Sequence, residues 1–267
     1  LMSLTVHISG IGLLGPGLAD WATGQHALRD STIWQHAPTV VPAPQRLPAT
    51  ERRRAGNVVK ASIVVADQAL AMASQFSGLD ASTLPTVFTS STGDPLNCHQ
   101  LCEALALPER LVSPTKFTNS VHNAPAGYWH IAAQSRAPST SLAAFDASFA
   151  AGLQEAAVQC VATGAPVLLV ACDVPYPEPL HALRPLSDVF ALALVLAPSG
   201  PGRAVTIDVA GNDAPTACTL PGLETVRTSI PAARALPLLQ SLAQPGASGL
   251  VVDGLSGQHL RVSVGAA

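Results

Sequence analysis

The fold of this chain is decided by residues 113–173, which read SPTKFTNSVHNAPAGYWHIAAQSRAPSTSLAAFDASFAAGLQEAAVQCVATGAPVLLVACD. The stretch begins as a polar loop and becomes helical near Pro125, because proline is tolerated in the first turn of a helix. We then expect a strand over Ser139–Phe145, a helix over Asp146–Thr163 that its own first residue can cap, and a buried apolar strand over Pro166–Cys172. This alternation of strands and helices predicts an α/β fold.

The flanking sequence continues the pattern in both directions. Apolar residues recur at helical spacing within residues 51–72, at Val59, Ile63, Ala66 and Leu70, which predicts one long helix with a single buried stripe. We further expect helices at 21–28, 95–105 and 231–243, and strands at 4–13, 85–90, 189–197, 203–209, 249–253 and 259–264. The strand at 189–197 is expected to be an antiparallel neighbour of the buried strand before it.

Composition excludes several classes of function. Of the residues, 48% are apolar and only 12% are charged, which leaves apolar surface to cover and predicts an obligate partner. The net charge of −3 gives no basic surface for nucleic acid or for an anionic membrane. No apolar run reaches the roughly 20 residues that a helix needs to span a bilayer.

The cysteines predict a reducing compartment. There are five of them, an odd number without the spacing of a disulfide scaffold, which suits the cytoplasm. Cys98 and Cys102 share one helical face, but no matching His or Cys pair follows them. We therefore expect neither a metal site nor a cofactor.

The order of segments in residues 113–173 resembles the N-terminal half of the β-ketoacyl-acyl-carrier-protein synthases, members of the thiolase-like superfamily. The stretches VHISGIGLLGPG (6–17) and RLPATERRRAG (46–56) fit the same family. The resemblance implies a thiolase-like half fold, with a mixed central sheet flanked by helices and a truncated C-terminal part. We expect one domain over residues 1–267, with a family-like core at 3–200 and a short divergent extension at 201–267.

The catalytic residues of that family are missing from the expected places. In the family a strand-to-helix elbow presents a cysteine that attacks the acyl thioester, and counting from Pro138 puts Asp146 at that position. A carboxylate is a poor nucleophile there, its product would be an unstable anhydride, and the helix dipole would keep it ionised. The family also uses two histidines from a second half, whereas His259 alone follows residue 200. No catalytic residue is therefore expected.

This combination is similar to the chain-length factors, inactive paralogues that pair with an active ketosynthase. The short form with its NAPAG-Tyr-Trp segment is most similar to those of aryl polyene pigment clusters. The resemblance implies a heterodimer with a β-ketoacyl synthase subunit, serving acyl carrier protein in polyene or fatty-acyl biosynthesis. It also implies that the strand at 139–145 pairs across the dimer axis.

The resemblance places a set of side chains near the partner or its acyl tunnel, where bulk would limit chain length. They are Asn119, His122, Asn123, Tyr128, Trp129, Phe145 and Ser148. Tyr128 and Trp129 are adjacent and so point about 100° apart on a helix. We expect one of the two rings in the core and the other at the interface.

Two other functions stay open at this point. The first is a minimal acyltransferase, thioesterase or malonyl decarboxylase that uses Asp146, His122 or Ser148. Against it, Ser120 near His122 lacks the G-x-S-x-G elbow of hydrolases. The second is a binding or homodimeric scaffold protein that merely keeps the fold.

Two further features have simple structural interpretations. The glycines of Gly10-x-Gly12-x-x-Gly15 resemble a dinucleotide fingerprint, but no β-α-β unit follows at the right distance, so we expect a structural turn. Asp173 closes the buried strand and is interpreted as an ordinary cap or surface residue. It can cap the next turn or contact a partner, and the sequence does not decide between these roles.

Overall fold

A mixed eight-stranded sheet forms the centre of the protein in the order β3-β2-β4-β5-β1-β6-β8-β7. The computed structural model describes residues 3–75 and 78–267. The strands are β1 Leu4–Leu14, β2 Thr86–Thr89, β3 Ser139–Leu142, β4 Val167–Asp173, β5 Phe190–Ala197, β6 Arg203–Gly211, β7 Ser248–Leu255 and β8 Gln258–Val264. Strands β3, β2 and β4 are parallel and the other pairs are antiparallel, so the expected mixed sheet and the antiparallel β4–β5 pair are confirmed.

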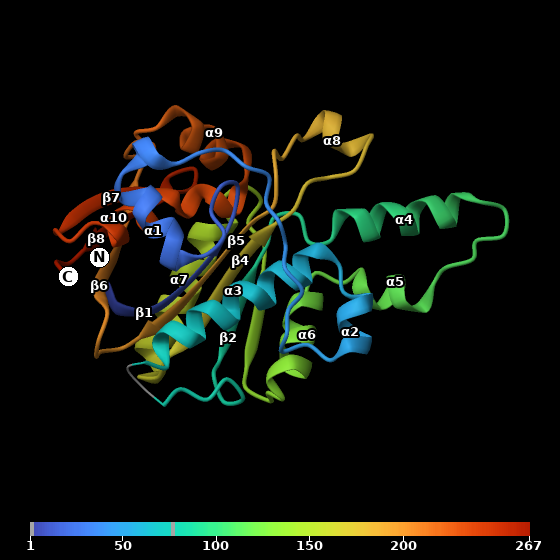
Figure 1. Cartoon of the computed structure of the whole chain (residues 1–267), viewed down its shortest axis with the longest axis horizontal. Helices are drawn as coiled ribbons and strands as arrows, with labels where there is room; N and C mark the ends of the chain where they lie inside the picture. The colour runs from blue at the N-terminus through green and yellow to red at the C-terminus, as the bar shows by residue number, and fades with distance from the viewer. Residues whose placement is uncertain (1–2, 76–77) are drawn as a thin grey trace.

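Helices cover both faces of the sheet (Figure 1). Helices α3 and α6 lie on one face, and α1, α7, α9, η2 and α10 on the other. The helical segments are α1 Trp21–Arg29, η1 Ser31–Ile33, α2 Ala49–Arg54, α3 Asn57–Ala73, α4 Pro95–Ala106, α5 Pro114–Asn119, α6 Ala124–Ala133, α7 Ser148–Thr163, α8 Leu180–Leu183, α9 Pro221–Ser229, η2 Pro231–Ala235 and α10 Leu236–Ala243.

Strand β4 explains why a continuous apolar run is needed at the centre. Its successive side chains point to opposite faces, so Leu169 and Ala171 join the core under α7 whereas Leu168 and Val170 join the core under α3. All seven residues of β4 are buried. A strand covered on both sides has no solvent face on which polar residues would be tolerated.

The glycine pattern of β1 serves close packing. Gly10 and Gly12 lie inside the strand, and a Cβ there would meet the carbonyl oxygens of Ala69 at 2.1 Å and Val65 at 1.9 Å. Both oxygens belong to α3, which crosses β1 directly. The expectation of a turn at these two glycines is therefore wrong, because their missing side chains let helix and strand backbones touch.

The single long helix expected at 51–72 is also wrong. It divides into α2 and α3 at Gly56, whose backbone is extended with φ −72° and ψ 173°. A Cβ at Gly56 would meet the Asp94 carboxylate oxygen at 2.1 Å, so the chain turns where only glycine fits. Helix α3 is buried on more than one stripe, because the sheet covers one side and α6 covers another.

Residues beyond 202 continue the same sheet. Strand β6 pairs with β1, and β8 and β7 follow outward. Helix α9 was not expected from the sequence, and the expected helix at 231–243 divides into η2 and α10, with Pro237 in the first turn of α10. Within the described residues, every helix is too short or too polar to cross a bilayer.

Candidate functional site

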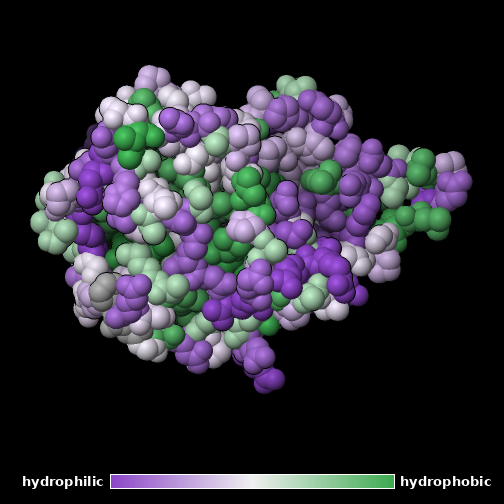
Figure 2. Space-filling view, viewed as in Figure 1, coloured by the Kyte–Doolittle hydropathy of each residue, from purple (hydrophilic) through white to green (hydrophobic). Residues whose placement is uncertain are grey.

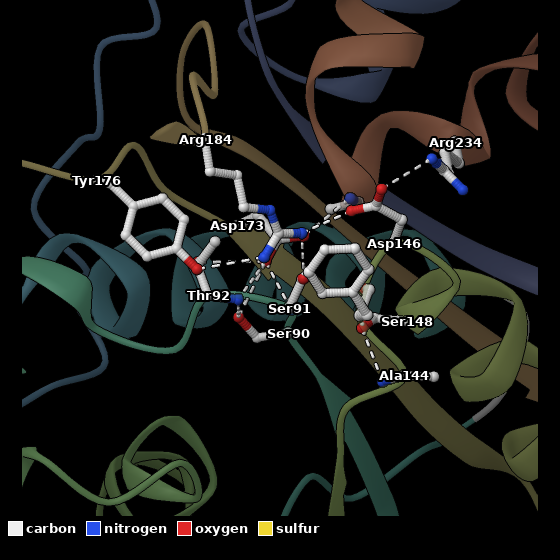
Figure 3. A network of polar contacts seen from close by, with 12 residues as sticks. Ser90, Ser91, Thr92, Ala144, Asp146, Ser148, Asp173, Tyr176, Arg184 and Arg234 are labelled. Atoms are coloured by element: carbon white, nitrogen blue, oxygen red, sulfur yellow. Dashed lines mark hydrogen bonds and ion pairs between the residues drawn. The ribbon is translucent and has the colours of Figure 1, made fainter. Parts of the chain in front are cut away.

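The elbow between β3 and α7 is the candidate site, because it holds the position of the expected nucleophile. Strand β3 ends at Leu142, earlier than expected, since the chain then turns sharply towards α7. Phe145 has a left-handed φ of 51°. The buried Ser148 hydroxyl donates to the Phe145 carbonyl at 2.7 Å and accepts from the Ala144 N–H at 3.0 Å, which ties the turn together (Figure 3).

Asp146 does not cap α7, so that expectation is wrong. The residue at the N-cap is Ala147, and it makes no side-chain capping hydrogen bond. The carboxylate instead accepts from Arg184 Nη2 at 2.5 Å and lies 3.4 Å from Arg234 Nη2 (Figure 3). In both contacts the donor and the acceptor are charged, which makes them charge-assisted interactions.

Arg184 is the centre of the site. Besides Asp146, its Nη2 donates to the Ser91 hydroxyl at 2.8 Å, and its Nη1 donates to the Tyr176 hydroxyl at 3.3 Å (Figure 3). The guanidinium carbon lies 4.0 Å from the centroid of the Phe145 ring, within the range of a cation–π contact. One side chain therefore joins the elbow, the loop after β2 and the loop after β4.

The ion pairs continue into the C-terminal segment. Arg234 Nη1 lies 3.0 Å from Asp253, Arg227 lies 3.8 Å from the same carboxylate, and Arg227 pairs with Glu224 at 2.6 Å. The hydrogen bond from Arg227 lowers the pKa of Glu224 below its usual value. Together with Arg184 and Asp146 these residues supply three positive and three negative charges, so the network is neutral.

Asp173 forms a second, buried polar centre beside the elbow. Its side chain is 0% exposed. One carboxylate oxygen accepts from the N–H groups of Ser91 at 2.7 Å and Thr92 at 3.0 Å, and the other accepts from the N–H of Ala232 at 2.9 Å. Burial raises the pKa of Asp173. The interpretation as an ordinary cap or surface residue is wrong, because the carboxylate organises the loop before α4 from inside the core.

Ser91 joins the two centres. Its N–H binds the buried Asp173, and its hydroxyl accepts from Arg184. The sequence analysis identified neither of these two partners. Since Arg184 and Asp146 are 38 residues apart and Asp173 is 82 residues from Ser91, no local pattern could have found these contacts.

The other candidate residues divide into exposed and buried groups. The His122 ring is exposed and its Nε2 donates to the Ser90 carbonyl at 2.9 Å, while Asn123 is exposed. Asn119 is buried, donates to the Arg54 carbonyl at 2.8 Å and accepts from the Tyr128 hydroxyl at 3.0 Å. The structure does not bring His122 into the Asp146 network.

Tyr128 and Trp129 are both buried, at 8% and 0% exposed. The expectation that one ring lies in the core and the other at an interface is therefore wrong. Helix α6 packs against α3 on one side and against β2 and β3 on another, so both directions are covered within the chain.

The described groups around the elbow are poorly suited to nucleophilic attack. Asp146 is held in two ion pairs, and both hydrogen-bonding functions of the Ser148 hydroxyl are used. The thiols of Cys160 and Cys172 are buried, and burial raises the pKa of Cys160 to about 11 and raises the pKa of Cys172 as well. Among the described residues no three metal-binding side chains gather into a group.

Comparisons with known proteins agree with this architecture. The family model for the N-terminal domain of β-ketoacyl synthase matches residues 21–250, so the chain belongs to that family. A comparison with curated proteins found no match.

Solved structures share the whole fold. One is a chain from the complex of the ketosynthase ApeO with its chain length factor ApeC from Xenorhabdus doucetiae, with a TM-score of 0.72 and 24% identity over 97% of this chain and 99% of that one. Another comes from the ishigamide ketosynthase/chain length factor, with a TM-score of 0.68 and 14% identity over 98% of this chain and 99% of that one. A third, from AntDE:AntF, a type II polyketide synthase acyl carrier protein in complex with its ketosynthase, has a TM-score of 0.74 and 12% identity over 100% of both chains. The thiolase-like half fold expected from the sequence is confirmed.

Proposed function

We propose that this chain is a non-catalytic, chain-length-factor-like subunit that forms a heterodimer with a β-ketoacyl synthase and serves acyl carrier protein. The observation that carries the proposal is the state of Asp146. The family's nucleophile position holds a carboxylate, and that carboxylate is committed to two arginines. A carboxylate held in two ion pairs stabilises the elbow and does not act as a nucleophile.

The size of the fold supports the same function. The alignments with chains of the ApeO–ApeC and ishigamide complexes cover nearly all of this chain and nearly all of the matched chain. Both complexes join a ketosynthase to a chain length factor. By likeness to them, we infer that this chain assembles with a ketosynthase in the same way.

The exposed surface is suited to a partner chain. Strand β3 lies at the edge of the sheet and leaves one side of its backbone unpaired, as cross-dimer pairing would require. Helices α4 and α5 project from the sheet as an arm (Figure 1), and apolar residues gather at the tip of that arm (Figure 2). Large apolar side chains along the arm and nearby are exposed: Leu105, Leu107, Leu111, Phe117, Val121 and Ile131. A partner chain would remove this apolar area from water.

The biosynthetic setting is the finer part of the proposal. We place the chain in aryl polyene or related fatty-acyl biosynthesis in the cytoplasm, on the resemblance of its NAPAG-Tyr-Trp segment. The tunnel role now rests on the exposed candidates His122, Asn123 and Phe145. The buried pair Tyr128 and Asn119 would act by supporting the helix behind them.

Intact-mass spectrometry tests the proposal. The purified chain is incubated with acyl- and malonyl-acyl carrier protein, both alone and after co-expression with a candidate partner ketosynthase. We expect this chain to stay unmodified while the ketosynthase gains the acyl group, and a ketosynthase variant without its nucleophilic cysteine to gain none. An acyl adduct on this chain alone would overturn the proposal in favour of an enzyme.

A further inference from the structure

Phe145 is held in a conformation that needs explanation. Its φ of 51° lies in the left-handed region, which bulky residues rarely adopt, and its side chain is 65% exposed. Such a strained backbone conformation costs free energy and persists only where the surroundings enforce it. An exposed aromatic ring at a strained position therefore points to a use for that ring.

Ser148 ties the backbone of the turn, and the Arg184 guanidinium holds the ring, with its carbon 4.0 Å from the ring centroid. A free arginine side chain would sample many rotamers, but this one is fixed at its tip by Asp146, Ser91 and Tyr176. These partners come from the elbow and from the loops after β2 and β4. Because Ser91 is anchored in turn by the buried Asp173, the guanidinium has a rigid base.

The charge of Arg184 is balanced inside the network, so the arginine does not need an external anion. Its charge is met by Asp146, whose second oxygen faces Arg234, and Arg234 is met by Asp253. The side chain of Arg184 is only 24% exposed. Three of its N–H donors are bound inside the chain, and one flat face of the guanidinium is covered by the Phe145 ring.

The ring lies where a partner on the β3 edge would meet it. Phe145 comes three residues after Leu142, the last residue of the edge strand. A partner strand that paired with β3 would therefore lie close to the Phe145 ring. A rigid, exposed aromatic side chain is the kind of group that contributes most to protein–protein binding, because little conformational freedom remains to be lost.

We propose that Asp146 and Arg184 hold the Phe145 ring as a preorganised anchor for the ketosynthase subunit. Asp146, at the position of the family's nucleophile, then acts as a positioning residue for Arg184, and Arg184 positions the ring. This inference rests on the proposed function, since the occupant is the same ketosynthase partner.

Binding of the co-expressed ketosynthase to variants of the full chain tests the inference. We expect F145A and R184A each to weaken the affinity by about tenfold, as loss of an anchor does. R184K keeps a charge for Asp146 but loses the planar face and the fork of donors, and so should bind nearly as weakly as R184A. R261A is the matched control, because its exposed ion pair with Asp213 lies outside the network, and its affinity should be unchanged.

A second measurement separates anchoring from simple folding and needs no partner. With 4-fluorophenylalanine at position 145, the fluorine NMR signal should be a single narrow line that shifts and broadens in R184A, while the melting temperature of R184K stays within a few degrees of the parent. Unchanged affinity in F145A or R184A, with the parent chain binding well, overturns the inference and leaves the proposed function standing. If the parent chain binds no ketosynthase, or if F145A abolishes self-association instead, the partner is not a ketosynthase and both ideas fail.

Discussion

Two aspartates beside the elbow show how differently one side chain can be stabilised. Asp146 is 41% exposed and is bound by the guanidinium groups of Arg184 and Arg234. Asp173 is fully buried and is bound by backbone N–H groups of Ser91, Thr92 and Ala232 together with hydroxyls. Charges balance the exposed carboxylate, and neutral dipoles balance the buried one.

The difference follows from the cost of desolvation. Near the surface Asp146 keeps part of its hydration while it pairs with the arginines, so the desolvation cost of the pair is small. Around Asp173 a second charge would have to lose its own hydration as well, whereas N–H groups at a turn and at η2 need an acceptor in any case. The buried residue is thus part of the fold, and the exposed one is available for function.

The largest expected effect is on the buried centre. D173N should lower the free energy of unfolding by roughly 3 kcal/mol, because an amide presents one acceptor oxygen and leaves donors on its other side unpaired inside the core. Urea denaturation measures the change. D213N, at a surface ion pair 50% exposed on the aspartate side, is the control and should change stability by about 0.5 kcal/mol or less. Equal losses of unfolding free energy in D173N and D213N would contradict the structural role assigned to the buried Asp173.

The next effect concerns reactivity at the elbow. D146C places a thiol beside Arg184 and Arg234, whose charges favour the thiolate. We expect iodoacetamide to label it roughly ten times faster than the exposed Cys98, whose pKa is raised by partial burial and by Cys102. Peptide-resolved mass spectrometry compares the sites within one sample. Labelling slower than that of Cys98 would show that the arginines do not act on position 146.

A smaller effect is expected when the charge of Asp146 is removed and its shape kept. D146N should cost about 1 kcal/mol of stability, because the ion pairs it weakens are partly exposed. Thermal unfolding of D146N beside D173N measures the contrast. The two asparagine variants should differ by about 2 kcal/mol in unfolding free energy, and a reversed order would refute the division into a fold residue and a function residue.

The smallest effect is a dependence on pH. Glu224 has a pKa lowered by its hydrogen bond from Arg227, so its contribution to stability is present above the unfolded pKa and is lost as pH falls through the folded pKa. The stability difference between the parent chain and E224Q should be greatest at neutral pH, a few tenths of a kcal/mol, and should vanish as the pH falls below the folded pKa of Glu224.

The contribution of Asp173 to stability changes with pH in the opposite direction to that of Glu224. Because burial raises its pKa, the folded chain binds this proton more readily than the unfolded chain, and the stability from this group is present below the unfolded pKa and lost as pH rises through the folded pKa. Denaturant titrations of the parent chain and D173N across pH 3–7 resolve the two contributions. For Glu224, a difference in unfolding free energy between the parent chain and E224Q that did not fall with falling pH would contradict its assigned contribution.

The predictions from sequence succeeded where the signal was local. The apolar runs at 166–172 and 189–197 predicted the buried strands β4 and β5. They failed where another element decided the outcome. Gly56 divides the predicted helix because Asp94, from another segment, occupies the space of its missing side chain.

The sequence by itself determined the α/β fold, because the order of apolar periods along the chain predicts it. The family, the mixed sheet and the place of Asp146 at the elbow came from the resemblance of residues 113–173 to the β-ketoacyl synthases. The tertiary structure alone decided what the carboxylate does there. Arg184 and Arg234 reach Asp146 from 38 and 88 positions away. Electrostatic contacts depend on distance in space, and residues so far apart in sequence become neighbours only when the sheet and its loops have formed.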